Sequence, residues 1–265
     1  HVLGLVDDRK PLGPFLKLGI MAAVCLAIPL LSPTTRLLTM LDARVGSPWL
    51  SIGLTALWLL VITNALNFMD NMDGLSAGTA TIAAACFLAA ALLHNQWFVG
   101  ACLALLIGAC LGFLAFNKPP ASIFMGDGGS LVLGFLLGFL TVRTTYIPEI
   151  GPGVTPGAWY GVFMPLCVLA IPIYDFTSVV LIRLRQGKSP FVGDLQHLSH
   201  RLVRLGLSKR AAVVVIWGMT LITGVSGIVL GSLAPWQAVL IGAQVVVMLV
   251  ILALFEYAAS HREST

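Results

Sequence analysis

Residues 97–116 read WFVGACLALLIGACLGFLAF and carry no charged side chain. A helix needs about 20 mostly apolar residues to cross the hydrocarbon core of a bilayer, because each residue advances it by only about 1.5 Å. This stretch meets that requirement by itself. The sequence therefore predicts a membrane-spanning helix here.

Similar stretches along the chain predict an all-α, polytopic membrane bundle of about eight helices. The fifth stretch is the weakest, since Arg143 lies near its end, and Pro165 with Pro172 predicts a kink in the sixth. Gly- and Ala-rich stretches permit close helix contact, so we expect a single membrane domain over residues 1–265. The candidate spans are 14–31, 49–68, 75–93, 97–116, 129–146, 158–182, 211–231 and 235–256.

The composition excludes an ordinary soluble domain. The chain is 58% hydrophobic and 10% charged, whereas soluble domains carry about 25% charged residues. Lipid must therefore cover most of the surface. The 5 cysteines lie inside apolar stretches without a Cys-x-x-Cys spacing. They indicate core residues rather than disulfides or thiolate metal sites.

Basic residues are concentrated on one side of the predicted membrane domain. With alternating spans, that side contains residues 1–13, 69–74, 117–128 and 183–210, and the positive-inside rule makes it cytoplasmic. Most acidic residues lie on the same side, although carboxylates contribute little to topology. We therefore expect these four segments to form the face that carries an interfacial active site.

The segment 64–78, NALNFMDNMDGLSAG, joins two predicted spans and carries polar side chains where a helix leaves the bilayer. Such side chains are costly there unless they are paired. The amides of Asn64 and Asn67 could read a nucleobase or a sugar, and the carboxylates of Asp70 and Asp73 could hold a hard divalent cation. Helix capping near Gly74 is the structural alternative, but it explains one residue rather than four.

Residues 124–130, FMGDGGS, open the fifth predicted span. Consecutive glycines at a helix N-terminus present backbone N–H groups to an anion. Asp127 would repel a phosphate there unless a cation lay between them, which favours Mg²⁺. An aspartate that caps a helix in a glycine turn is the common alternative, and this motif alone does not decide between the two.

Two further polar segments lie on the predicted cytoplasmic side. Asp7 and Asp8 could bind metal or accept a proton, although a solvated interfacial loop is the simpler interpretation beside two basic residues. In the segment 189–201, SPFVGDLQHLSHR, a helix would place His197, His200 and Arg201 in one polar stripe that ends before Gly206. The stripe could face phosphates or anchor the chain to anionic lipid, and two histidines favour the phosphates.

Taken together, these segments resemble the polyprenyl-phosphate N-acetylhexosamine-1-phosphate transferases of glycosyltransferase family 4. That family includes phospho-N-acetylmuramoyl-pentapeptide transferase and the GlcNAc-1-phosphate transferases. The resemblance runs in order over nearly the whole chain. The Ser-Pro-Phe…Asp…His pattern in the segment 189–201 favours the GlcNAc-1-phosphate branch. It implies transfer of a sugar phosphate from a UDP-sugar to undecaprenyl or another polyprenyl phosphate, with release of UMP, as the first membrane step of cell-envelope glycan synthesis.

The resemblance also implies roles for matched residues. Asp7 and Asp8 match tandem aspartates near the catalytic centre, with Asp8 as a candidate base toward the lipid phosphate. Asp127 matches the Mg²⁺ ligand, Phe124 an aromatic that stacks on uracil, and the histidines lie near the pyrophosphate. The expected catalytic residues are Asp7, Asp8, Asp70, Asp73, His197 and His200; the substrate-binding residues are Asn64, Asn67, Asn117, Phe124, Lys17 and Arg201; the metal ligands are Asp127 and Asp73.

The sequence departs from the family pattern in two places. Ser199 replaces the middle histidine of a His-x-His-His motif, and we expect that position to be dispensable or compensated by Arg201. The family has further helices before the tandem aspartates, whereas this chain opens at a polar cluster with no predicted helix before it. We therefore expect the sequence to be incomplete at its N-terminus.

The resemblance implies Mg²⁺ as the cofactor, with Mn²⁺ as the alternative. The expected partners are a UDP-N-acetylhexosamine, a polyprenyl phosphate and the bilayer of the cell inner membrane; no nucleic acid is expected, and a homodimer stays open. The rival function is a secondary transporter, whose charged residues should lie near the bilayer midplane. Here the charges gather at one face, which favours the enzyme.

Overall fold

The computed structural model describes residues 1–144, 162–190, 194–230 and 233–262. These residues fold almost entirely into helices, and no strand occurs among them. The predicted all-α class is therefore confirmed. Residues 145–146, 158–161 and 231, which belong to predicted spans, lie outside the described ranges.

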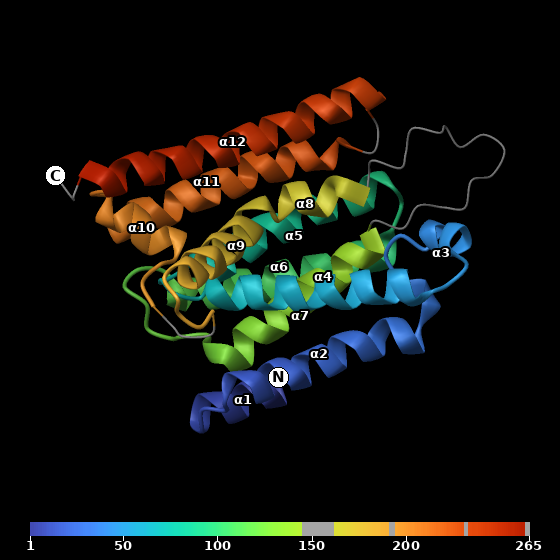
Figure 1. The fold of residues 1–265 in the computed structure, drawn as a ribbon, viewed down its shortest axis with the longest axis horizontal. Helices are drawn as coiled ribbons and strands as arrows, with labels where there is room; N and C mark the ends of the chain where they lie inside the picture. Colours follow the sequence, from blue (N-terminus) through green and yellow to red (C-terminus); the bar gives the residue numbers. More distant parts are fainter. Residues whose placement is uncertain (145–161, 191–193, 231–232, 263–265) are drawn as a thin grey trace.

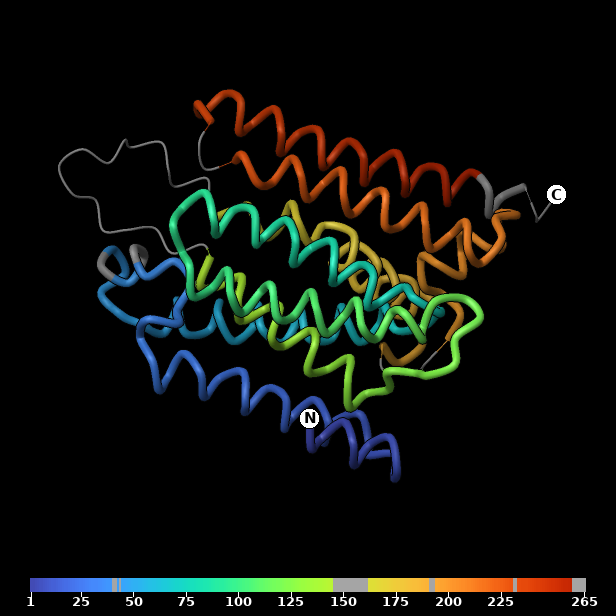
Figure 2. The backbone as a smooth tube through the Cα atoms, turned by 180° about the vertical axis from the view of Figure 1, so that it is seen from behind, coloured from blue at the N-terminus to red at the C-terminus, as the bar shows by residue number. Residues whose placement is uncertain are grey.

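Six long helices form most of the bundle. Among the described residues, these helices are long and apolar enough to cross a membrane. They lie side by side along one common direction (Figures 1 and 2). The chain is therefore a multi-pass membrane protein. The six are α2 (Pro14–Leu31), α4 (Trp49–Phe68), α5 (Leu75–Leu93), α6 (Trp97–Asn117), α11 (Lys209–Ile228) and α12 (Pro235–Arg262).

The other two predicted spans are helical but less regular. The fifth is α7 (Gly126–Thr144), which begins at Gly126 rather than at residue 129 and has Asp127 and Arg143 near its ends. The sixth is divided at Leu169 into α8 (Met164–Val168) and α9 (Ala170–Arg185). The division falls at the predicted kink, because Pro172 has no N–H to donate to the Val168 carbonyl. Among the described residues, length and composition alone therefore identify six of the eight predicted spans.

Short helices lie at the two ends of the bundle. The helix η1 (Pro33–Thr35) and the helix α3 (Met40–Val45) lie at one end, and α10 (Leu198–Arg204) lies at the other. At that second end, Val2–Arg9 form a further helix, α1. The polar cluster at residues 4–10 was expected to be part of a loop, but most of it is helical, and α1 packs on α7 through the buried Gly4.

Helix α5 lies at the centre of the core, in contact with α6, α7 and α11. Small side chains on α5 allow this close packing, as in many membrane bundles. At Gly78, a Cβ would collide with the indole ring of Trp217 from α11. The alanines of α5 with no exposed surface are Ala77, Ala80, Ala83 and Ala84.

Gly134 marks the closest approach between α7 and α4. A Cβ at Gly134 would lie 2.8 Å from the Cα and the carbonyl oxygen of Thr63. Both are backbone atoms, so neither can rotate away as a side chain would. The absence of a side chain at Gly134 therefore allows α7 to pack directly against the backbone of α4. Helix α7 is the helix that opens with the Gly-Asp-Gly-Gly motif.

Gly134→Ala should lower the free energy of unfolding by about 1–3 kcal/mol, the usual cost of overpacking a core. Thermal unfolding in detergent measures the change. Gly108→Ala on α6 is the matched control, because a Cβ there meets nothing within 4 Å. Equal melting temperatures for the two variants would contradict the packing of α7 on α4.

Candidate active site at one end of the bundle

Segments that are distant in the sequence meet at the end of the bundle opposite α3. Helix α1, the loop after α4, the start of α7 and the helix α10 all lie there (Figure 1). These elements carry most of the residues that the sequence singled out.

Lys17 of α2 lies between two carboxylates. Its Nζ is 3.0 Å from Asp7 Oδ2, and it also donates to Asp127 Oδ2. Asp7 additionally accepts the backbone N–H of Leu12 at 2.6 Å. Burial by itself would raise the pKa of Asp7, but hydrogen bonding with Asp127, Leu12 and Lys17 lowers it below the usual value. Lys17 therefore joins α1 to the start of α7 by charge.

Asp8 caps the N-terminus of α7. Its Oδ1 accepts the N–H of Asp127 at 2.9 Å, and its Oδ2 accepts the N–H of Gly128 at 2.9 Å. A carboxylate is stabilised there by unpaired N–H groups and by the helix dipole. Gly126 has a φ of 62°, and a Cβ on it would lie 2.8 Å from Asp8 Oδ2. The anion at this glycine-rich turn is thus a side chain of the protein itself.

Asp127 lies at the centre of the cluster. Asn67 Nδ2 donates to Asp127 Oδ1 at 2.7 Å and to Ser130 Oγ at 2.8 Å. Burial, followed by the negative charge of Asp127, raises the pKa of Asp70 to about 6. The charge of Asp8 acts in the same direction. The cluster therefore combines carboxylates from α1, from the loop after α4 and from α7.

Two other predicted residues hold the loop between α6 and α7. Asn117 is buried; it accepts the N–H of Gly74 at 2.9 Å and donates to the Ile123 carbonyl at 2.8 Å. Asp73 Oδ2 accepts the N–H of Ala121 at 3.0 Å. Both side chains therefore shape the loop that carries Phe124.

The remaining two predicted residues of this region differ in exposure. Asn64 donates to the Leu60 carbonyl of its own helix at 2.7 Å. Phe124 is 78% exposed, at the end of the bundle that carries the carboxylates. An exposed aromatic ring can stack on a nucleobase, whereas Asn64 already has a partner within α4.

His197 precedes α10 and is buried against α9. Its Nδ1 lies 3.0 Å from Asp175 Oδ2, and the ring meets Phe68 edge-on with centroids 5.3 Å apart. The His200 ring centroid is 6.5 Å from that of His197. Burial, followed by the charges of His197 and nearby basic side chains, lowers the pKa of His200.

The other two residues of the histidine segment are engaged within the protein. Arg201 Nε donates to Glu256 Oε1 of α12 at 2.8 Å, and its other nitrogens donate to Ser178 and Gln196. Ser199 Oγ donates to Asn71 Oδ1 at 2.5 Å. Helix α10 is therefore tied both to α12 and to the loop after α4.

Sequence reasoning missed several polar residues near the site. Asp175 and Arg183 are 1% and 2% exposed, and Arg183 NH2 lies 2.9 Å from Asp194 Oδ1. The Arg183 guanidinium also lies 5.3 Å from the centre of the Phe68 ring. A signal was present, since charged residues within or beside an apolar span are rare and usually functional. Glu256, near the end of the last span, carried the same signal.

The donor set of the cluster fits a hard divalent cation. Asp8, Asp70 and Asp127 offer oxygen atoms only, which Mg²⁺ prefers. Within the described part of the chain, however, no three His, Cys, Asp or Glu side chains already form a coordination group.

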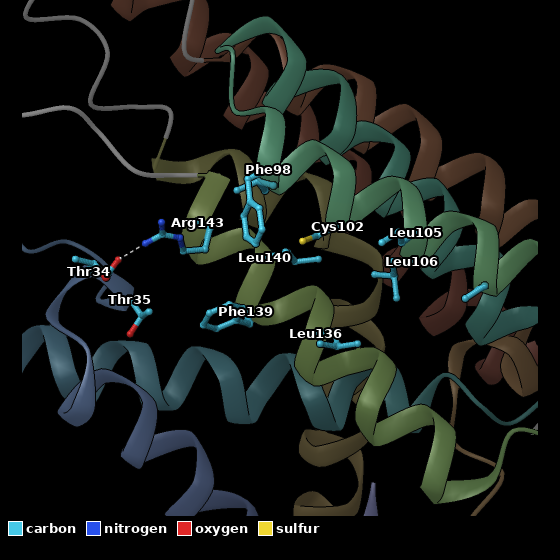
Figure 3. Close-up of a pocket in the computed structure, with 12 residues that line it drawn as sticks. Thr34, Thr35, Phe98, Cys102, Leu105, Leu106, Leu136, Phe139, Leu140 and Arg143 are labelled. Atoms are coloured by element: carbon cyan, nitrogen blue, oxygen red, sulfur yellow. Dashed lines mark hydrogen bonds between the residues drawn. The ribbon is translucent and has the colours of Figure 1, made fainter.

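A separate groove of about 670 Å³ lies at the opposite end of the bundle, between η1, α6 and α7 (Figure 3). Its lining is mostly apolar and includes Phe98, Phe139 and Leu140. Arg143 lies at its edge and donates to the Thr34 carbonyl at 2.8 Å. The groove contains none of the carboxylates or histidines described above, so it is not the candidate active site.

Comparisons with known proteins give one family match and several similar sequences. Residues 1–145 match the family described as glycosyl transferase family 4. The chain is 33% identical to a probable undecaprenyl-phosphate N-acetylglucosaminyl 1-phosphate transferase of Bacillus subtilis, over 95% of the chain and 69% of that protein. It is 32% identical to a decaprenyl-phosphate N-acetylglucosaminephosphotransferase of Mycolicibacterium smegmatis, over 81% of the chain and 57% of that protein.

A relative from the other branch matches less of the chain. It is a phospho-N-acetylmuramoyl-pentapeptide-transferase of Desulforudis audaxviator, 33% identical over 68% of the chain and 50% of that protein. The chain thus spans between 50% and 69% of the length of these three relatives.

Proposed function

The chain belongs to glycosyl transferase family 4, and from that premise we propose that it transfers N-acetylhexosamine 1-phosphate from a UDP-sugar to a polyprenyl phosphate. UMP is the second product. GlcNAc 1-phosphate is the proposed group, because relatives named for its transfer match more of the chain than the muramoyl-pentapeptide relative does. The site is proposed to face the cytoplasm from the inner membrane.

The observation that carries this proposal is the carboxylate cluster around Lys17, at the end of the bundle that also carries His197 and His200. Both reactants are anionic, so the site must offset their mutual repulsion. Lys17 supplies a fixed positive charge between Asp7 and Asp127. The carboxylates of the cluster outnumber this single ammonium, so they also suit a divalent cation, which would add further positive charge.

We propose Mg²⁺ as that cation, with Mn²⁺ as the alternative. Asp127 is the proposed direct ligand, with Asp70 as its acidic neighbour. Asp73 accepts the Ala121 N–H through one carboxylate oxygen, which leaves its other oxygen for the cation. A bound cation of this kind stabilises charge on phosphoryl oxygens. Asp8 contributes differently, because it fixes the start of α7 and hence the position of Asp127.

In the proposed reaction, an oxygen of the lipid phosphate attacks the phosphorus next to the sugar. A new P–O bond forms, the bond to the uridine-bearing phosphate breaks, and UMP leaves with the electron pair. The lipid phosphate is mostly dianionic near neutral pH, because its second pKa is about 6. It needs little activation, so single displacement is simpler than a route through a phosphorylated aspartate.

Purified full-length protein, mixed with undecaprenyl phosphate, Mg²⁺ and a panel of UDP-sugars, tests the proposal. UMP should appear with UDP-GlcNAc, and its release should require both the lipid phosphate and the divalent cation. Absence of UMP with every UDP-N-acetylhexosamine would refute the function. A trapped phosphoaspartate would refute single displacement alone.

A further inference from the structure

We propose that Asp175 is a positioning residue that holds the ring of His197 in one tautomer and one orientation for the transfer reaction. This inference rests on the proposed function. Asp175 is not among the residues that the sequence motifs indicated. It belongs to α9, whereas His197 lies at the start of α10.

The geometry gives each oxygen of Asp175 a separate partner. Asp175 Oδ2 lies 3.0 Å from His197 Nδ1, and Asp175 Oδ1 accepts the N–H of Leu198 at 2.5 Å. Asp175 is 1% exposed, and the His197 side chain is 8% exposed. A buried carboxylate is retained only where hydrogen bonds compensate for its lost hydration. Here the two compensating groups are the ring of His197 and the backbone next to it.

Other charged groups near Asp175 have partners of their own. Arg183 is paired with Asp194 at 2.9 Å, and Arg201 is paired with Glu256 at 2.8 Å. These two buried guanidinium groups are therefore matched to other carboxylates. The imidazole of His197 is the side chain that Asp175 contacts through its Oδ2.

This contact determines which ring nitrogen of His197 carries hydrogen. An ionised carboxylate only accepts hydrogen bonds, so Nδ1 must be the donor. The neutral ring then keeps its lone pair on Nε2, the nitrogen directed away from Asp175. His197 can use Nε2 to receive or return a proton at a phosphate, and as imidazolium it can donate from the same atom. Edge-on contact with Phe68 restricts the plane of the ring.

Asp175→Asn reverses this arrangement without changing the size of the side chain. The N–H of Leu198 can only donate, so it would retain the amide oxygen. The amide nitrogen would then face His197 Nδ1, which would have to accept a hydrogen bond. The ring hydrogen would consequently move to Nε2. The substitution therefore changes the tautomer of His197 while the ring stays equally buried.

The test uses full-length protein in detergent micelles, with ¹⁵N-labelled histidine and assignment of His197 by comparison with His197→Gln. In the wild type, Nδ1 of the neutral ring should be protonated; in Asp175→Asn, Nε2 should be. The kcat for UMP release should fall about 10- to 100-fold, the usual effect of removing such a supporting hydrogen bond. The KM for the UDP-sugar should hardly change. Asp42→Asn, at the opposite end of the bundle, should behave like the wild type.

Two results would overturn the proposal. One is a neutral wild-type His197 ring that carries its hydrogen on Nε2, which can be observed even if Asp175→Asn does not fold. The other is an additive effect, in which Asp175→Asn lowers kcat as much in a His197→Gln background as in the wild type. The NMR measurement needs no turnover, so a wild type that releases no UMP would count against the proposed function and not against this geometry.

Discussion

Asp127→Asn should reduce UMP release to less than about one-thousandth of the wild-type rate, since a removed charge-stabilising group typically costs 10²–10³ and here a cation ligand is lost as well. The substitution also disrupts local hydrogen bonding. Lys17 and Asn67 both donate to the Asp127 carboxylate. An amide offers one oxygen, so its NH₂ group would face one of these donors.

Measurement of kcat at saturating UDP-GlcNAc and lipid phosphate, across a range of Mg²⁺ concentrations, tests this expectation. Asp42→Asn is the matched control, because Asp42 accepts a hydrogen bond from Ser51 at 2.8 Å at the far end of the bundle. The control should keep full activity. If Asp127→Asn retains more than a tenth of wild-type turnover, the cation must bind elsewhere.

Apolar stretches predicted the long helices well because length and hydropathy dominate in lipid. The spans 14–31, 49–68 and 75–93 coincide with α2, α4 and α5. Prediction was poorer where charged residues interrupt the apolar pattern. Asp127 extends α7 beyond its apolar part, and Asp175 lies in the short helix α9. Helix α1 was missed because its short apolar part was outweighed by the polar residues that follow it.

The sequence also predicted that the acidic segments would gather on one face, because basic residues set the topology. It could not predict which groups would pair. Asp8 meets the start of α7 only because Gly4 allows α1 to touch the Asp127 backbone. Residues so far apart in the chain carry no local signal of their contact. Ser199 illustrates the same limit, since its partner Asn71 belongs to a different loop.

Ion pairs between helices hold this end of the bundle together. Lys17 joins α2 to α1 and α7, whereas Arg201 joins α10 to α12. Breaking one partner of a partly buried pair leaves the other charge uncompensated, which is more costly than losing the attraction alone. Substitutions of Lys17 should therefore have large effects.

Lys17→Met should lower kcat about 10²- to 10³-fold, the range observed when one charge-stabilising group is removed from an active site. Methionine keeps a similar length and an apolar surface, but it leaves the carboxylates of Asp7 and Asp127 without the ammonium between them. Their greater negative charge should attract a divalent cation more strongly. The Mg²⁺ concentration for half-maximal activity should therefore fall while kcat falls too, a combination that simple unfolding would not produce.

Lys10→Met provides the comparison, because Lys10 is an exposed cation just after α1. It should preserve both kcat and the Mg²⁺ requirement, whereas Lys17→Arg should recover part of the lost rate by restoring the charge. Wild-type turnover in Lys17→Met would show that the bridge is dispensable. A reduced rate with an unchanged Mg²⁺ requirement would show that Lys17 acts on the fold and not on the cation, because the electrostatic coupling between the ammonium and the carboxylates would then be absent.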